Sequence, residues 1–303
     1  MTGATQVVFM NQRSFNVAPV NTVAPVVTGT TTVGQTLSST TGTWTGVPTP
    51  TFTYQWFRSP STSISGATSS TYTLVSADIG NTIYCQVTAT NVAAAVSANS
   101  NTTATITLPA VGAAFGGGYF AGQISTAGTG VADYNLVIAP VASGENSSKQ
   151  WKTSNTSTAG TSSVIDGPTN SSNMNNATHP AAQFCEGLSI GGFSDWYMPA
   201  KNELEVCYYN LKPTTTSNNT SSGTNTNAVP SRGSNYTSGT PAQTSATDFK
   251  SGGTEAFAAD SYWSSTENSA TDAWLQYFAS GVQGSTTSKT ASLRVRAVRR
   301  VAV

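Results

Sequence analysis

The sequence predicts a mainly β, multidomain protein, and three observations lead to this fold class. The chain has 303 residues, enough for two or three domains. Charged residues make up only 9%, whereas an ordinary globular domain has about 25%. Small polar residues take their place, and 27 Gly and 13 Pro supply turns. Because β-branched Thr and Val favour pleated backbone, this mixture favours short strands and long surface loops over helices.

The balance of charge limits the classes of partner. Lys and Arg number 13 and Asp and Glu also number 13, so no bulk field attracts nucleic acid or an anionic membrane. The opening "MTGATQVVFMNQRSF" lacks the features of a signal peptide, and no apolar run is long enough to span a membrane. We therefore expect no nucleic-acid partner, no membrane insertion, and synthesis in the cytoplasm without a signal peptide. Four arginines crowd the C-terminus, and we interpret them as flanking a final strand: Arg294, Arg296, Arg299 and Arg300.

Residues 1–21 are expected to form an N-terminal arm. Its apolar segment "VVFM" predicts a single strand, which is too small to fold alone. We expect the arm to anchor the protein on a partner, and a floppy terminus is the alternative.

Residues 22–108 are predicted to form a β-sandwich. The segment "TFTYQWFRS" alternates along a strand with Trp56 at its centre, and "DIGNTIYCQVTATN" follows with Ile83 and Cys85 on one face. About seven short strands with a core Trp in the third are typical of an immunoglobulin-like sandwich. "YQWFR" and "DIGNTIYCQVTATN" resemble the immunoglobulin-like modules of bacterial and phage proteins. Leu37 takes the position of the usual second Cys, so we expect Cys85 to be a reduced core residue.

The C-terminal part is expected to be an α+β domain. Residues 109–118 are rich in Gly and Ala and are predicted to be a hinge, and residues 119–303 form the domain. The segments "HPAAQFCEGLSI" and "AKNELEVCYYNLK" predict two helices, the second with Leu204, Tyr208 and Leu211 facing a core. A polar loop follows at about 214–254, and three strands are expected after residue 260.

Three blocks of this domain resemble one family. They are "CEGLSIGGFSDWYMPAKNELE", "YWSSTENSATDAWLQYFASG" and "LRVRAVRRV", and together they resemble the Lcl C-terminal domain family over residues 119–303. That family is similar to C-type lectin folds, a scaffold used for adhesion. The resemblance thus implies a C-type-lectin-like domain.

The residues of these blocks that match the family's pattern are interpreted as a structural clasp. Asp195 is expected to accept turn N–H groups, Pro199 to fix the entry of the helix, and Glu203 to complement its dipole. Asp195 or Glu203 is expected to pair with Arg296 or Arg299. The three tryptophans of the blocks are expected in the core rather than stacked on carbohydrate: Trp196, Trp263 and Trp274.

The resemblance also raises the question of a disulfide bond. Where the family has a Cys in its final strand, this chain has Ala297, so Cys185 lacks that partner. Cys207 on the second helix is the substitute, and a Cys185–Cys207 bond stands beside the alternative of two free thiols.

No residue pattern points to catalysis. His179 precedes Pro180 at a helix start without a nucleophile nearby, and we expect a cap or surface position. Glu203 and Glu205 point to different sides of a helix, which argues against an acid–base dyad. Three cysteines without a CxxC pair and one His do not form a zinc site, and no EF-hand spacing occurs. We expect a protein that is not an enzyme and has no cofactor or metal.

The leading functional hypothesis is a phage virion protein, a tail or fibre adhesin on the virion surface. The resemblance implies that the lectin-like domain binds a host surface glycan or protein, and that the arm contacts other virion proteins. The alternative is a capsid-decorating or fibre-assembly subunit with no specific ligand. A third interpretation, a bacterial surface adhesin, is disfavoured by the missing export signal. Tail adhesins are usually trimers, so a homo-oligomer is expected. The expected ligand face consists of exposed loop residues: Tyr236, Glu267, Asn268, Asp272 and Tyr277.

Overall fold

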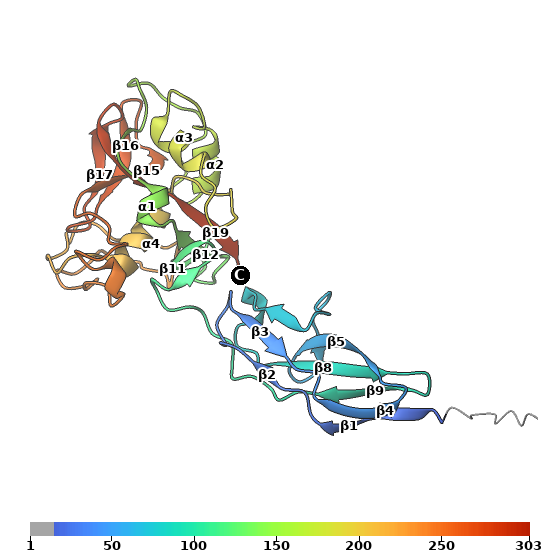
Figure 1. The fold of residues 1–303 in the computed structure, drawn as a ribbon. Helices are drawn as coiled ribbons and strands as arrows, with labels where there is room; N and C mark the ends of the chain where they lie inside the picture. The colour runs from blue at the N-terminus through green and yellow to red at the C-terminus, as the bar shows by residue number, and fades with distance from the viewer. Residues whose placement is uncertain (1–14) are drawn as a thin grey trace, which may run out of the picture. The chain divides into compact units, whose positions relative to one another are not determined.

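The computed structural model describes residues 15–303 and divides the chain into two compact units, Met1–Leu108 (unit 1) and Pro109–Val303 (unit 2). Strands dominate in both units, and the longer helices belong to unit 2 (Figure 1). The mainly β, multidomain fold class is therefore confirmed. Within residues 15–303, no helix is long and apolar enough to cross a membrane.

The predicted N-terminal arm is only partly described. Residues 1–14, which include the "VVFM" segment, lie outside the described residues. The following residues form strand β1 (Val17–Val23), which pairs antiparallel with β4 (Thr43–Val47). Residues 17–21 therefore belong to the fold of unit 1, because their backbone groups are paired with β4 rather than left free for a partner.

Unit 1 is built from short strands in two main sheets. Besides β1 and β4, its elements are β2 (Val27–Thr28), β3 (Thr36–Ser39), β5 (Thr51–Arg58), β6 (Thr62–Ser63), β7 (Thr71–Thr73), the 3-10 helix η1 (Ser76–Asp78), β8 (Ile83–Thr90) and β9 (Ala95–Asn99). One sheet has the order β6-β5-β8-β9 and the other the order β2-β3-β7. Trp56 lies directly opposite Cys85, and its ring centroid is 5.7 Å from that of Tyr72 on the other sheet. Trp56, Cys85, Leu37 and Ile83 are fully buried, as expected for a core.

Unit 2 contains two five-stranded sheets. Its strands are β10 (Ala114–Phe115), β11 (Gly118–Ile124), β12 (Tyr134–Ile138), β13 (Glu145–Gln150), β14 (Ala228–Val229), β15 (Ser261–Glu267), β16 (Asp272–Tyr277), β17 (Gln283–Ser288), β18 (Ser292–Arg296) and β19 (Val298–Ala302). The first sheet has the order β10-β11-β12-β19 with β14 beside β11, and the second the order β13-β18-β15-β16-β17. Five strands follow residue 260 instead of the three expected. The polar β17 has no alternation of apolar residues to indicate it, and the last segment divides into β18 and β19, which belong to different sheets.

The predicted hinge at 109–118 is a folded part of unit 2. Ala114 pairs with Tyr119 across a tight turn, and the side chain of Phe115 is buried. Gly116 and Gly117 both have positive φ, a conformation that glycine adopts without strain. The glycines therefore serve the turn between β10 and β11 rather than flexibility.

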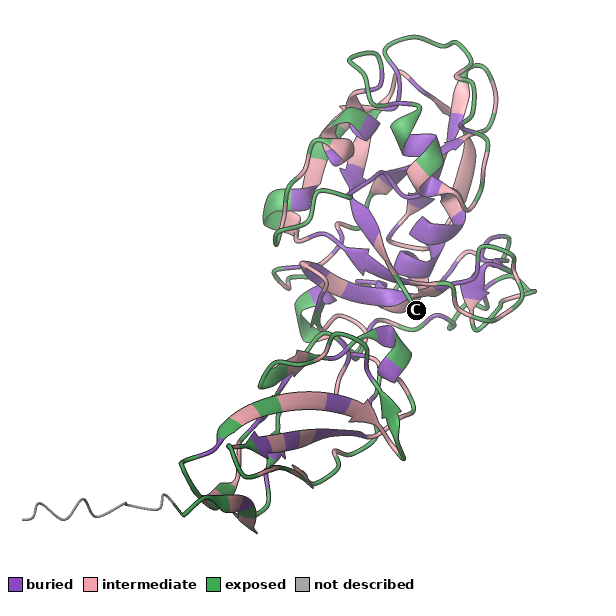
Figure 2. Cartoon of the chain, turned by 90° about the vertical axis from the view of Figure 1, so that its right-hand side faces the viewer, coloured by how far each residue is buried: buried purple, intermediate pink, exposed green. Residues whose placement is uncertain are grey.

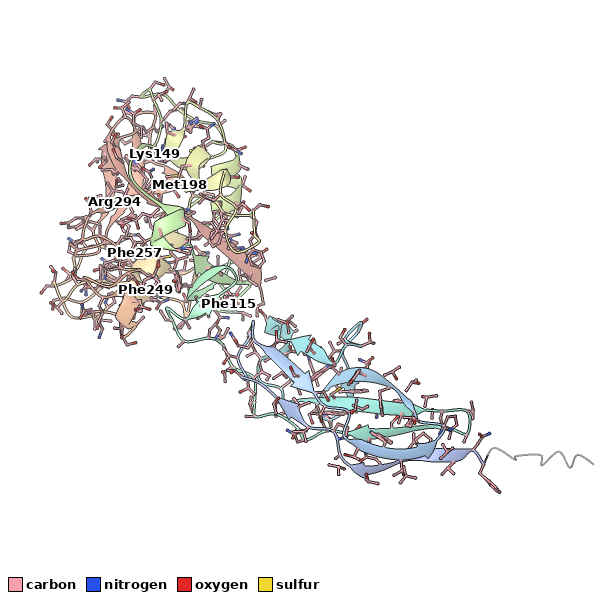
Figure 3. All side chains as sticks on the ribbon, in the orientation of Figure 1. Phe115, Lys149, Met198, Phe249, Phe257 and Arg294 are labelled. Carbon is pink, nitrogen blue, oxygen red and sulfur yellow. The ribbon has the colours of Figure 1, made fainter. Side chains whose placement is uncertain are left out.

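The helices of unit 2 are short except for one. They are α1 (Val141–Gly144), α2 (Gly167–Ser172), α3 (Pro180–Glu186), α4 (Lys201–Leu211) and the 3-10 helix η2 (Thr247–Phe249). The two predicted helices correspond to α3 and α4, and both are confirmed. Helix α4 packs against β11, β15 and β16, and eight of its eleven residues are buried. Figure 2 shows that the buried residues concentrate in the strands and helices, whereas the outer loops are mostly exposed. Leu204, Tyr208 and Leu211 belong to the same apolar cluster as Phe249 and Phe257 (Figure 3).

Candidate functional site

Glu203 ties the start of α4 to strand β19. Its carboxylate accepts hydrogen bonds from the Ala200 amide at 2.8 Å, the Tyr197 hydroxyl at 2.5 Å and Arg300 Nε at 2.8 Å. Burial raises the pKa of Glu203, and Arg300 opposes that shift. The first-turn role expected for Glu203 is present. Its arginine partner differs from the expected Arg296 or Arg299, because successive β19 residues face opposite sides of the sheet.

Asp195 pairs with Arg299, one of the two arginines expected for it. Arg299 donates from Nε and Nη2 at 2.7 and 2.9 Å, and its guanidinium lies 3.8 Å from the Phe193 ring centroid. Asp195 therefore contacts the closing strand and not the N–H groups of its own turn. The Pro199 carbonyl accepts from the Ser265 amide at 2.8 Å, which fixes the entry of α4 on β15.

The tryptophans of the clasp occupy two kinds of position. Trp196 and Trp263 are fully buried, and their indole N–H groups donate to the Phe193 and Lys149 carbonyls. Trp274 is only half-buried, with Lys201 Nζ 4.2 Å from its ring centroid. The core position expected for Trp274 is therefore wrong, because it lies on the less buried face of β16.

The C-terminal arginines serve the interior of unit 2. Arg296 is fully buried, donates to the Ala139 carbonyl and to the Glu255 carboxylate at 2.8 and 2.9 Å, and lies over the Phe257 ring. Arg294 pairs with Glu145 at 2.9 Å. All four C-terminal arginines have carboxylate partners and lie on β18 and β19, as expected for residues of a final strand.

The cysteines are all free, so the Cys185–Cys207 disulfide is wrong. Cys207 on α4 lies in the main apolar cluster, whereas Cys185 is buried on α3. Burial raises the pKa of both thiols. His179 is the N-cap residue of α3, one of the two expected positions, but it is buried rather than at the surface, and its ring nitrogens bond to Thr158 and Asn176.

Two residues of the expected ligand face do not lie in exposed loop positions. Tyr236 is buried at 6% exposure instead of lying in an open loop, although it lines the cavity described below. Glu267 accepts from the Thr158 amide and the Thr161 hydroxyl at 3.0 Å and forms an ion pair with Lys289. The Glu267 side chain organises the interior, so its assignment to a ligand face is wrong, whereas for Tyr236 only the exposed position is wrong.

Of the other three, Asn268 and Asp272 lie at the turn between β15 and β16, and Tyr277 lies at the opposite end of β16. Asn268 is exposed but donates to the Ser285 carbonyl at 2.7 Å. Asp272 accepts from the hydroxyls of Ser269 and Thr271 at 2.9 and 2.8 Å, and Tyr277 is half-buried. Asn268 and Asp272 stabilise their own turn, and the structure does not gather the three residues with Tyr236 into one cavity.

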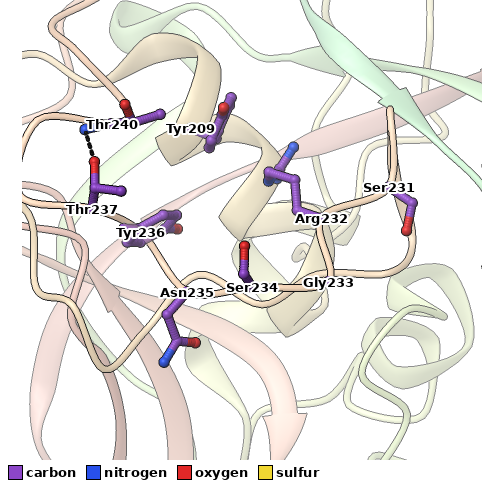
Figure 4. Close-up of a pocket in the computed structure, with 9 residues that line it drawn as sticks. All are labelled: Tyr209, Ser231, Arg232, Gly233, Ser234, Asn235, Tyr236, Thr237 and Thr240. Carbon is purple, nitrogen blue, oxygen red and sulfur yellow. Dashed lines mark hydrogen bonds between the residues drawn. The ribbon is translucent and has the colours of Figure 1, made fainter.

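A cavity of about 300 Å³ lies instead beside α4, under residues 222–241, which we call the cavity loop (Figure 4). Its wall combines aromatic, hydroxyl and amide side chains with one guanidinium and no carboxylate. The lining residues are Tyr209, Ser231, Arg232, Gly233, Ser234, Asn235, Tyr236, Thr237 and Thr240. This mixture suits a small polar ligand with apolar faces.

Glu205 attaches the cavity loop to α4. It is fully buried and accepts from the Tyr236 hydroxyl at 2.7 Å and from Asn225 Nδ2 at 2.5 Å, and it forms an ion pair with Arg232. Burial and the Glu205 charge raise the pKa of Tyr236, so the phenol remains a donor. Glu203 and Glu205 thus face different sides of the helix, and each binds one Tyr and one Arg.

Backbone pairing and a second anchor fix the shape of the cavity loop. Asn225 and Arg232 exchange two backbone hydrogen bonds at 2.8 and 3.0 Å. The Thr240 amide donates to the Thr237 hydroxyl at 2.9 Å (Figure 4). Asn218 donates to the Thr237 carbonyl at 3.1 Å and accepts from the Tyr208 hydroxyl at 2.6 Å. Hydrogen bonds within the chain therefore fix the shape of the cavity without a ligand.

Sequence reasoning missed most of this cavity. Arg232 lies with its guanidinium carbon 3.9 Å from the Tyr209 ring centroid, a cation–π geometry. The available signal was that Arg232 is the only charged residue between Lys212 and Asp248. A lone charged residue in an uncharged loop indicates an ion-pair partner elsewhere in the fold. The sequence does not identify Glu205 as that partner, because the two residues are 27 positions apart.

A second cavity of about 380 Å³ lies beside Trp196. Glu186 and Asp195 both line it, and burial raises the pKa of Glu186. Asp195 is already committed to Arg299. Over residues 15–303, no group of three His, Cys, Asp or Glu side chains could hold a metal ion.

The match to a protein-family model shows which family the chain belongs to. The model described as the Lcl C-terminal domain matches residues 144–299, more than half of the chain. The chain belongs to the Lcl C-terminal domain family. In this Lcl-family protein, the matched residues contain α4, Glu203, Glu205 and the whole cavity loop.

Other comparisons add little. No curated protein matches the sequence of this Lcl-family protein. Among solved structures, a fimbrial protein from Bacteroides ovatus is similar with 13% identity and a TM-score of 0.35, covering 91% of this chain and 70% of that one. That level of similarity is too low to define a shared fold.

Proposed function

We propose that this Lcl-family protein is an adhesin that binds a host cell-surface glycan through the cavity beneath the cavity loop of unit 2. The observation that carries the proposal is the cavity itself, whose hydroxyl, amide and aromatic wall suits saccharides. No other cavity of unit 2 described above combines these groups on one anchored loop. Glu205 and Asn218 hold the loop before any ligand arrives, which lowers the entropic cost of binding.

The setting we favour is a phage virion, with the protein on a tail or other surface appendage. The low content of charged residues and the many Ser, Thr and Asn side chains suit a virion-surface protein. Unit 1 would be an immunoglobulin-like spacer built around Trp56, and unit 2 a C-type-lectin-like binding domain. We propose a homo-oligomer, with residues 1–14 and other virion proteins contributing to attachment. Within the proposal, no enzymatic step, nucleic acid or membrane insertion is needed.

Adsorption of the labelled full chain to a panel of bacterial strains tests the proposal. Ser234 is exposed and lines the cavity, so Ser234→Trp is expected to fill it. Ser238 is exposed in the same loop but does not line the cavity, and Ser238→Trp is the matched control. Staining of a responsive strain should fall by about tenfold or more with Ser234→Trp only. Equal staining by both variants would refute the site.

A second candidate function is an assembly or capsid-decorating subunit. Strand β1 exposes Val17, Val20 and Val23 at 47%, 52% and 56%, and Val47 on β4 is 51% exposed. Exposed apolar residues gathered on one ribbon are typical of interaction surfaces. Immunogold labelling of the intact particle discriminates the two functions, since a head lattice indicates decoration and a tail tip indicates adhesion.

A further inference from the structure

We propose that the cavity takes an uncharged, hydroxyl-rich saccharide unit in preference to an anionic one. This inference rests on the proposed function and names the chemical class of its ligand. It follows from how the one cationic side chain of the cavity, Arg232, is already used.

Arg232 is committed to the protein. Its Nη2 donates to the Glu205 carboxylate, and the plane of its guanidinium is held over the Tyr209 ring. Its Nε is buried and has no hydrogen-bond partner among the described residues. Because Nε is closed off by burial and one N–H of Nη2 is used by Glu205, only the remaining N–H groups of Nη1 and Nη2 are left for a ligand. Recognition of a carboxylate or sulfate by arginine is strongest as a pair of parallel N–H bonds, and at Arg232 such a pair would compete with the ion pair to Glu205.

Recruiting Arg232 to an anion would damage the interior. Glu205 is fully buried, and Arg232 is its only cationic partner in the described ion pairs. If the guanidinium turned toward a ligand, a buried carboxylate would lose its counter-charge. That loss corresponds to a reduction in affinity of about a hundredfold or more.

The remaining wall matches a neutral polyol. Ser234, Asn235, Thr237 and Thr240 are exposed and offer hydroxyl and amide groups that both donate and accept. No second cation and no carboxylate lines the cavity, so the site carries no uncompensated charge. A volume of about 300 Å³ is at the small end for ligand cavities and suits one sugar ring.

Binding of the full chain to paired oligosaccharides tests the inference. The probes are neutral oligosaccharides, each with its uronate or sulfated counterpart, titrated by calorimetry. A neutral member should bind about tenfold or more tightly than its charged counterpart. Its affinity should change by less than about twofold between low and high NaCl, because no screened charge pair forms.

Two double variants locate the binding. Ser234→Ala with Asn235→Ala removes polar groups of the wall and should weaken neutral binding by about tenfold. Ser217→Ala with Ser238→Ala changes two exposed serines outside the wall and should leave it unchanged. Thermal unfolding checks that both variants fold.

The outcomes separate the inference from the proposed function. Tighter binding of charged members, or an affinity that falls steeply with salt, overturns the inference while leaving adhesion through the cavity intact. Binding of neutral members that the wall variant does not weaken also overturns it. If the full chain stains no bacterial strain at all, the proposed function itself fails.

Discussion

Replacing Glu205 by Ala removes the acid that holds the cavity loop on α4. The change leaves Arg232 without its ion pair and Tyr236 without its acceptor, in a site where Glu205 is fully buried. Removing one partner of a buried pair costs about 3–5 kcal/mol. For a unit of this size, each kcal/mol lowers the unfolding midpoint by about 2–4 °C. We expect the midpoint of unit 2 to fall by about 6–20 °C.

Asp260→Ala is the matched control for this prediction. Asp260 also pairs with an arginine, Arg294, but its side chain is 58% exposed, and Arg294 keeps Glu145 as a second partner. Exposed ion pairs contribute less than about 1 kcal/mol, so the midpoint should fall by about 4 °C at most. Differential scanning calorimetry of the full chain separates the transitions of the two units. Equal shifts for the two variants would refute the argument that burial, rather than pairing itself, decides the effect.

Three further predictions concern His179, the thiols and the tryptophans. Burial and the charges of Lys residues nearby lower the pKa of His179 from 6.5 to about 4. Between these values the unfolded chain binds a proton that the folded chain does not. Stability should therefore fall as the pH decreases, by up to about 1.4 kcal/mol per pH unit, and urea unfolding should show a shallower fall for His179→Gln. Cys185 and Cys207 are buried, so a thiol reagent should react with them only after unfolding, and reductant should not change the unfolding midpoint. Trp263→Ala should destabilise unit 2 by about 3–5 kcal/mol in denaturant titrations, because Trp263 is fully buried. Changing the half-buried Trp274 to Ala should destabilise unit 2 clearly less than Trp263→Ala. Equal losses of stability would contradict the assignment of Trp263 to the core and of Trp274 to the less buried face of β16.

Local patterns predicted much of the fold. The alternation around Trp56 identified a core strand, and the spacing of Leu204, Tyr208 and Leu211 identified the buried face of α4. Both signals depend only on neighbouring residues and their period. The hinge predicted from the glycines at 109–118 was wrong, because the sequence does not distinguish a flexible Gly from one required by a tight turn.

The candidate site was harder to predict, because its contacts join distant segments. Glu205 and Arg232 are 27 residues apart, and no local sequence pattern around either residue predicts that the two form a pair. Tyr236 was expected in an exposed loop, since its neighbours are Ser, Thr, Asn and Gly. Its hydroxyl instead satisfies a buried carboxylate, an arrangement that only the packed fold creates.

The two buried glutamates of α4 lie on different sides of the helix. Glu203 faces β19 and stabilises the scaffold, whereas Glu205 faces the cavity loop. One helix therefore connects the closing strand of unit 2 to the proposed binding cavity. Substitutions at Glu203 should affect stability first, and substitutions at Ser234 or Asn235 should affect adhesion first.

The central claim is that a host glycan binds beneath the cavity loop. Hydrogen exchange of the full chain, with and without surface polysaccharide from a strain that it stains, tests this claim most directly. We predict slower exchange in residues 231–240 and in the adjoining C-terminal turn of α4. Protection confined to residues 268–277, with none in 231–240, would contradict the account.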